Sequence, residues 1–220
     1  MRDHSFRVDP RKLDPLGAFA HVREGILARL EHARSLLPAG TDLLFIEGYR
    51  PLALQQRYFT DYRGELAAAH PGWTAEQLHH AASRYVSPPE IAPHSAGAAV
   101  DVTLVDQDGH EIDLGTRVNA SPEESDGACF TRAPNLSDHA RHHRALLLNA
   151  MENAGFTNNG TEFWHFSVAD RYDALMRQEP GCRHPASAVT RVGQRSAGIA
   201  AASSSSRSRL PRRSAMSSKR

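Results

Sequence analysis

Apolar side chains recur at helical spacing near the start of the chain. They predict an amphipathic helix over about residues 15–36, and the positions on its buried face are Phe19, Val22, Ile26, Leu30 and Ala33. Pro51 can occupy the first turn of a second helix, which runs on through Phe59. Thr74 is a suitable N-cap for a third helix, which Ser87-Pro88-Pro89 ends.

The pattern changes to that of strands between these helices and after them. The run at 42–47 (DLLFIE) is short and apolar, as in a strand. In 98–105 (AAVDVTLV) apolar residues alternate with others, so Asp101 faces away from the valines and a half-buried strand is predicted. The turn residues Gln107-Asp108-Gly109 then predict a hairpin that returns through 111–114.

The pattern returns to helical spacing further along the chain. A helix is predicted over about 136–154, with Leu147 and Met151 inside and Gly155 as its C-cap. A last strand is predicted over about 162–168. Helices and antiparallel-looking strands are mixed without regular βαβ repetition. The pattern therefore predicts an α+β fold, a small antiparallel sheet with flanking helices.

Composition narrows the class of protein. Of the 220 residues, 40% are hydrophobic and 23% are charged, which is typical of a soluble globular chain. No stretch approaches the roughly 20 apolar residues that span a bilayer, and the charged start lacks the apolar region of a secretory signal. We therefore expect a cytoplasmic location without a membrane partner. Cys129 and Cys182 lack a CxxC partner, so we expect both to be free thiols.

Charge divides the chain into two parts. Residues 183–220 hold nine of its 26 basic residues and no acid, and they are rich in Ser and Arg. This composition predicts a disordered tail after a folded domain at 1–182. No aromatic residue is interleaved in the tail for base stacking, so we expect no nucleic-acid partner. The oligomeric state is not set by the sequence.

Three short segments carry candidate chemistry: EGYRP at 47–51, HSAGAAVD at 94–101 and EFWH at 162–165. Zinc favours His nitrogens and a carboxylate, and a catalytic zinc keeps three protein ligands and one open position. His94 and Asp101 can meet at one metal if the chain turns at Gly97, and His165 supplies a third ligand from another strand. We expect Glu162 at the irregular start of that strand, where it can reach the site without binding the metal.

Other histidines are weaker candidates for metal ligands. His139, His142 and His143 fall in a predicted helix without a carboxylate at suitable spacing, and a solvated helix face explains them better. His79-His80 is interpreted in the same way. The chain has no HExxH, GxSxG, P-loop or GxGxxG motif, which removes the commonest rival enzyme classes.

The three segments, in this order, are similar to the D-alanyl-D-alanine dipeptidases. These are zinc enzymes of the DD-peptidase/Hedgehog-like fold, and they include the vancomycin-resistance dipeptidases. The motifs here read EGYRP, HSAGAAVDVTL and EFWHF, and the resemblance spans about residues 20–170. It also covers GTR at 115–117 and MENAGF at 151–156, whereas the segment before the first helix looks shortened.

The resemblance implies a role for each motif residue. His94, Asp101 and His165 become the ligands of one zinc ion per chain, and Glu162 becomes the general acid/base. Arg50 becomes the cation that holds the developing oxyanion. Tyr49 and Ser95, within the motifs, become substrate-binding residues. Asn119 becomes a third, at a position where relatives often have an acidic residue that binds the substrate amine. Glu123 or Glu124 is the alternative for that last role.

The expected function is zinc-dependent hydrolysis of D-Ala-D-Ala or a similar small dipeptide, so the expected partner is a small peptide. Two alternatives stay open at this stage. One is a zinc D,D- or L,D-carboxypeptidase that acts on muropeptides. The other is a catalytically inactive zinc-binding module, against which the presence of Glu162 and Arg50 argues.

Overall fold

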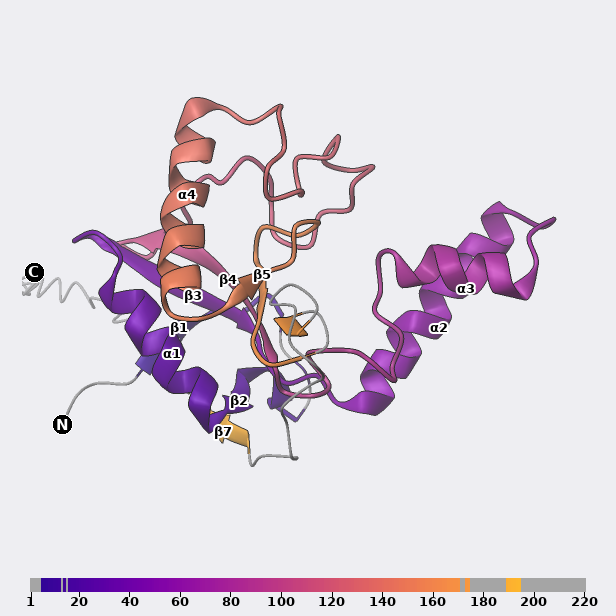
Figure 1. Ribbon diagram of the computed structural model, residues 1–220, viewed down its shortest axis with the longest axis horizontal. Coiled ribbons are helices and arrows are strands. Elements are labelled where there is room, and N and C mark those ends of the chain that lie inside the picture. Colours follow the sequence, from indigo (N-terminus) through magenta and orange to yellow (C-terminus); the bar gives the residue numbers. More distant parts are fainter. Residues whose placement is uncertain (1–4, 13, 15, 171–172, 175–188, 195–220) are drawn as a thin grey trace, which may run out of the picture.

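The computed structural model describes residues 5–12, 14, 16–170, 173–174 and 189–194 (Figure 1). Its main sheet has the strand order β5-β6-β4-β3-β1-β8. The bounds are β1 Ser5–Val8, β3 Thr41–Glu47, β4 Ala99–Asp106, β5 Thr157–Asn158, β6 His165–Ser167 and β8 Gly193–Gln194. A second sheet pairs β2 (His21–Arg23) with β7 (Val189–Arg191).

The α+β class predicted from the sequence is confirmed. Neighbouring strands from β5 to β3 are antiparallel, as expected. The sheet as a whole is mixed, however, because β1 pairs parallel to β3 and β8 pairs parallel to β1. Each of these two parallel pairs joins segments that are far apart in the sequence. No turn motif between the paired segments predicts the pairing.

Two helices cover one face of the sheet. They are α1 (Glu24–Ser35) and α4 (Asp138–Asn153), which lie side by side against it (Figure 1). Their buried side chains join those of the central strands in one core, which includes Ile26, Leu30, Leu147, Met151, Val100, Val102, Leu104 and Phe166. Most of the apolar burial that stabilises the domain is therefore on this side of the sheet.

The other two helices form an arm. α2 (Leu52–Ala69) and α3 (Ala75–Ser83) pack against each other and project away from the sheet (Figure 1). α3 begins as predicted at Thr74, with a complete capping box to Gln77. α4 also matches its prediction closely, with Gly155 in the left-handed conformation just after its end.

The helix predicted over 15–36 is wrong in its first part. A short 3-10 helix, η1, spans Ala18–Ala20, β2 follows it, and α1 begins only at Glu24. Gly17 at φ 65° interrupts any helix, and Val22 is buried in a strand that pairs with β7. Pairing with a distant strand therefore overrides the local helical spacing.

Three other predictions need correction. All but the last residue of β4 is buried, so the strand is not half-buried as predicted. The hairpin after it is reduced to a single bridge between Val105 and Glu111. The last strand begins at His165 rather than at 162. β4 is buried because β3 and β6 flank it on both sides, and a turn in which the amide of His165 donates to the carbonyl of Glu162 precedes the last strand.

Part of the predicted tail belongs to the folded domain. Residues 189–194 form β7 and β8, and the buried Val192 between them donates a backbone hydrogen bond to the carbonyl of Ala20. The boundary predicted after residue 182 is thus too early for these residues. The rest of the predicted tail, and Cys182, lie outside the described residues. No helix among the described residues is long and apolar enough to cross a membrane.

Candidate metal centre and active site

Three polar residues lie in a row across the face of the sheet opposite the helices. Asp101 on β4 pairs in register with Glu47 on β3 and with His165 on β6. Residues directly opposite on neighbouring strands present their side chains to the same face. The register shift between Phe45 and Glu47 is a bulge in β3, and it brings Glu47 into this row.

His94 joins this row from the loop before β4. Gly97 adopts a positive φ of 63°, and its amide donates to the carbonyl of His94, so the chain turns as the sequence predicts. The imidazole Nδ1 lies 2.7 Å from the carbonyl oxygen of Gly48. A hydrogen bond there fixes the ring and leaves Nε2 for the site.

Gly48 is required at this point. A Cβ atom there would lie 2.2 Å from the carbonyl oxygen of His21 and 2.8 Å from a methyl carbon of Val22. Only glycine allows the backbone to approach β2 this closely while presenting its carbonyl to His94. The glycine of the GYRP motif is therefore needed to position His94, a candidate metal ligand.

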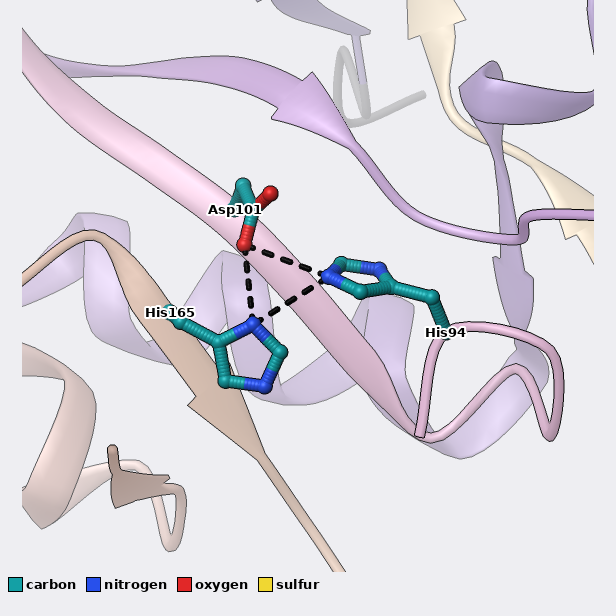
Figure 2. A group of neighbouring side chains, drawn as sticks. All are labelled: His94, Asp101 and His165. Atoms are coloured by element: carbon teal, nitrogen blue, oxygen red, sulfur yellow. Dashed lines mark hydrogen bonds and ion pairs between the residues drawn. The ribbon is translucent and has the colours of Figure 1, made fainter. Parts of the chain in front are cut away.

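The three predicted ligands converge on one point, as Figure 2 shows. His165 Nδ1 lies 3.1 Å from Asp101 Oδ1 and 3.2 Å from His94 Nε2. His94 Nε2 lies 3.3 Å from the same oxygen of Asp101. All three side chains are buried.

These distances suit a tetrahedral zinc ion. With metal–ligand distances of about 2.0–2.1 Å, the ligand atoms of a tetrahedral site lie about 3.3 Å apart. Two imidazole nitrogens and one carboxylate oxygen are also the donors that zinc prefers. The residues therefore fit the metal in both chemistry and spacing.

Electrostatics keep the carboxylate charged. Burial alone would raise the pKa of Asp101, but His94 and His165 hold this pKa well below its ordinary value. Burial would lower the pKa of His165, and its hydrogen bond with Asp101 raises it instead. The three groups therefore interact strongly, as expected of a compact site that binds a cation.

Glu162 lies next to the three donors but outside their cluster. Its carboxylate is 3.9 Å from His165 Nδ1. The amide of His165 donates to the carbonyl of Glu162, so a turn brings both side chains to the same side. The sequence predicts this irregular start of the strand. Loss of water contact raises the pKa of Glu162 above its ordinary value.

Arg50 is held rigidly beside the row. Its Nε and one Nη donate to Glu47 at 2.6 and 2.9 Å, and its other Nη donates to Gln55 at 2.7 Å. Glu47 is fully buried and also pairs with Lys12. Three of the five guanidinium N–H groups are thus engaged, and two remain for a ligand.

The family model described as D-ala-D-ala dipeptidase matches residues 19–183. The chain belongs to the D-Ala-D-Ala dipeptidase family. It is 30% identical over 187 residues to the D-alanyl-D-alanine dipeptidase of Synechocystis sp., covering 74% of each chain. It is 30% identical over 158 residues to that of Enterococcus faecium, covering 66% of this chain and 74% of the relative.

A solved structure, VanYB in complex with D-Alanine-D-Alanine, is similar at 18% identity and a TM-score of 0.39. The match covers 69% of this chain and 71% of that one. The family match confirms the resemblance seen in the motifs. By family, the chain is a metallopeptidase, and its predicted ligand, base and cation positions lie together in space.

Glu162 lines a cavity of about 640 Å³ between the arm and the loops around residues 120–130 and 159–162. The three candidate donors and Arg50 are not among the residues that line it. Glu162 and Glu123 both line it, together with the aromatic side chains of Tyr62, Trp73, Tyr85 and Phe130. Burial and the nearby charge of Glu162 raise the pKa of Tyr85 to about 12, so its hydroxyl stays protonated near neutral pH. No motif or spacing in the sequence predicts this aromatic lining.

None of the three predicted substrate-binding residues, Tyr49, Ser95 and Asn119, lines the cavity beside Glu162. Asn119 is exposed at φ 61° and is not among the residues that line the cavity. Tyr49 is half-buried, and its amide donates to the carbonyl of His21. Ser95 lines a different, neighbouring pocket. Glu124 is engaged by Arg117 and by the amide of Ser121.

Arg144 on α4 fixes the loop around residues 128–130, which forms one wall of the cavity, and no motif in the sequence points to this role. Its guanidinium donates to the carbonyls of Leu114, Ala128 and Phe130 at 2.6, 2.5 and 2.7 Å. It also lies 4.1 Å from the ring centroid of Phe163. Burial lowers the pKa of Arg144 to about 10, so it stays charged near neutral pH.

Proposed function

We propose that the chain hydrolyses D-Ala-D-Ala or a similar small peptide with one zinc ion held by His94, Asp101 and His165. The observation that carries this proposal is the convergence of three buried donors beside a carboxylate that lines a cavity. Bound zinc would supply a Lewis acid that polarises the scissile carbonyl and lowers the pKa of water toward about 7.

Glu162 is the proposed general acid/base. Its carboxylate accepts a proton from the attacking water and returns it to the amine that leaves. Asn159 supports this role, since its side-chain amide lies 3.4 Å from Glu162 Oε2.

Arg50 is the proposed oxyanion-stabilising cation. Glu47 and Gln55 fix its guanidinium in advance, so little reorganisation is needed as charge develops on the substrate oxygen. The rigid planar fork is the property that a lysine at this position would lack.

The cavity bears on the identity of the substrate. Pockets of about 300–1,000 Å³ hold drug-sized ligands, so this cavity has room for more than two alanine residues. This volume favours a second candidate function, removal of a terminal D-alanine from a longer peptide. An inactive zinc-binding module is disfavoured, since both Glu162 and Arg50 lie beside the donors.

Recognition of a free amine separates the two enzymatic candidates. Glu123 lines the cavity together with Glu162, whereas Asn119 does not. We therefore favour Glu123 as the acid that pairs with the ammonium group of a dipeptide, although the motif alignment favours Asn119. The cytoplasmic location predicted from the sequence remains a prediction.

The test is a substrate panel with purified protein and matched variants. We expect wild type to release D-alanine from D-Ala-D-Ala, and Glu123→Gln to lower the ratio of kcat/KM for D-Ala-D-Ala to that for its N-acetyl form. Asn119→Asp is the matched comparison. A higher kcat/KM for acylated peptides would select the carboxypeptidase, and no hydrolysis of any peptide would contradict both.

A further inference from the structure

Lys12 reaches the buried carboxylate of Glu47 from the segment that follows β1. Its ammonium group pairs with Glu47 Oε2, the oxygen that also accepts from one Nη of Arg50 at 2.9 Å. The side chain of Lys12 is 23% exposed, whereas that of Glu47 is fully buried. The family model matches the chain only from residue 19, so the match does not account for this contact.

The fold sets the position of Lys12. β1 runs parallel to β3, and just beyond β1 the amide of Asp9 donates to the carbonyl of Phe45 at 2.7 Å. The side chain of Asp9 then accepts from the amide of Arg11 at 2.8 Å, which turns the chain. Backbone contacts therefore hold the segment that brings Lys12 to Glu47 at the end of β3.

Glu47 holds the proposed oxyanion-stabilising cation, and its charge opposes the role of that cation. Arg50 donates to both carboxylate oxygens of Glu47. Taken alone, this ion pair has no net charge, so Glu47 weakens the attraction of Arg50 for a negative oxygen nearby. Lys12 adds a second positive charge to the same carboxylate. The group of three charges therefore keeps one net positive charge.

Lys12 is one of two cations that offset Glu47. Among the described residues, Arg50 and Lys12 are the ion-pair partners of this carboxylate. Burial alone would raise the pKa of Glu47, but the hydrogen bond from Arg50 and nearby charges, which include Lys12, hold it below its ordinary value. Asp101 also acts on Arg50, but Asp101 is a candidate metal donor whose charge bound zinc would offset.

We propose that Lys12 is a positioning residue of the active site, which offsets the charge of Glu47 and so leaves the positive charge of Arg50 available to the oxyanion. Glu47 can then hold the guanidinium in place without cancelling its charge. This inference rests on the proposed function, since it concerns the oxyanion that hydrolysis forms. It assigns a role in the reaction to a residue that belongs to none of the three motifs.

The first experiment measures steady-state kinetics on D-Ala-D-Ala. Lys12→Met should lower kcat about 10-fold and change KM by less than about twofold, because the missing charge acts mainly on the transition state. Lys12→Arg, which retains the charge, should keep kcat within about threefold of wild type. A kcat for Lys12→Met that equals that of wild type would overturn the inference.

Arg11→Met is the matched control. It removes the neighbouring cation of the same segment, which pairs with Asp9 and Glu111 rather than with Glu47. This variant should keep the kcat of wild type, and an equal loss of kcat in Arg11→Met and Lys12→Met would overturn the inference. If Lys12→Met does not fold, Lys12→Gln removes the charge but can still donate to Glu47, and the same 10-fold loss is expected.

A double-mutant cycle tests whether Lys12 acts through Glu47. In the Glu47→Gln background the charge that Lys12 offsets is gone, so adding Lys12→Met should change kcat by less than about twofold. The same 10-fold loss in both backgrounds would show that Lys12 acts independently of Glu47, and would overturn the inference.

A binding measurement separates this inference from the proposed function. The probe is a phosphinate analogue of D-Ala-D-Ala, which is tetrahedral and negatively charged where the oxyanion forms. Titrated calorimetrically into zinc-loaded protein, it should bind about 10-fold more weakly to Lys12→Met than to wild type and Arg11→Met. This difference without hydrolysis of any peptide would contradict the proposed function alone. Equal affinity for Lys12→Met and wild type, or no binding to wild type, would overturn the inference.

Discussion

The two faces of β4 differ in what they contribute to the protein. On one face, Val100, Val102 and Leu104 pack under α1 and α4 in the main core. On the other face, Asp101 lies in a row of charged and polar groups that meet His94 and His165. The two faces are buried to a similar degree, yet one holds hydrocarbon and the other holds the candidate chemistry.

This difference shows how one strand serves both stability and function. Alternation places successive side chains on opposite faces, so a change at one position affects one role with little effect on the other. Substitutions on the site face should change activity at nearly constant stability, whereas those on the core face should do the reverse. The following predictions test that separation.

The largest effect is expected at Glu162. Glu162→Gln removes the proton carrier without touching the three donors, and should lower kcat for D-Ala-D-Ala by about 1,000-fold. Zinc content and melting temperature should stay at wild-type values. Loss of zinc in this variant would instead make Glu162 a ligand.

Arg50 should give the next largest effect. Arg50→Lys retains the charge but loses the fork that Glu47 and Gln55 hold, so we expect kcat to fall about 100-fold with a smaller change in KM. Steady-state kinetics on D-Ala-D-Ala would measure the changes in kcat and KM separately. A kcat close to that of wild type would place Arg50 in a structural role only.

Val102 tests the opposite face. Its side chain is fully buried between β3 and the helices, so Val102→Ala should cost about 2 kcal/mol of unfolding free energy. Chemical denaturation measures this loss, and kcat of the folded variant should stay within about twofold of wild type. A large drop in kcat at temperatures where the variant is folded would show that the two faces are coupled.

The smallest effect is expected at Thr103, which shares the site face with Asp101. Its hydroxyl is buried without a hydrogen-bond partner among the described residues. Thr103→Val removes that unmatched group at nearly constant volume, so stability should be unchanged or rise by up to about 1 kcal/mol. Destabilisation would indicate that the hydroxyl has a partner in solution.

The sequence was most informative where the chemistry is local. The donors of the candidate site lie in three short motifs whose order and spacing match the family, and Gly97 marks the turn that brings His94 to Asp101. Helix α3 was predictable from the cap at Thr74, and α4 from apolar spacing. In these cases a single segment contains all the information that its structure needs.

The features that the sequence did not predict depend on segments that are distant from one another in the sequence. β2 resembled a helix because only its pairing with β7 makes it a strand, and β8 adds to the sheet edge without any strand pattern of its own. The cavity beside Glu162 and the smaller pocket beside Ser95 each combine residues from several elements. A motif search does not reveal them, because each side chain is unremarkable until the fold brings it beside the others.

The central claim is that His94, Asp101 and His165 together bind one zinc ion. The most direct measurement is the metal content of purified wild-type, His94→Ala and Glu162→Gln proteins after dialysis against the same zinc buffer. We expect close to one zinc per chain in wild type and in Glu162→Gln, and nearly none in folded His94→Ala. Equal zinc content in wild type and His94→Ala would contradict it.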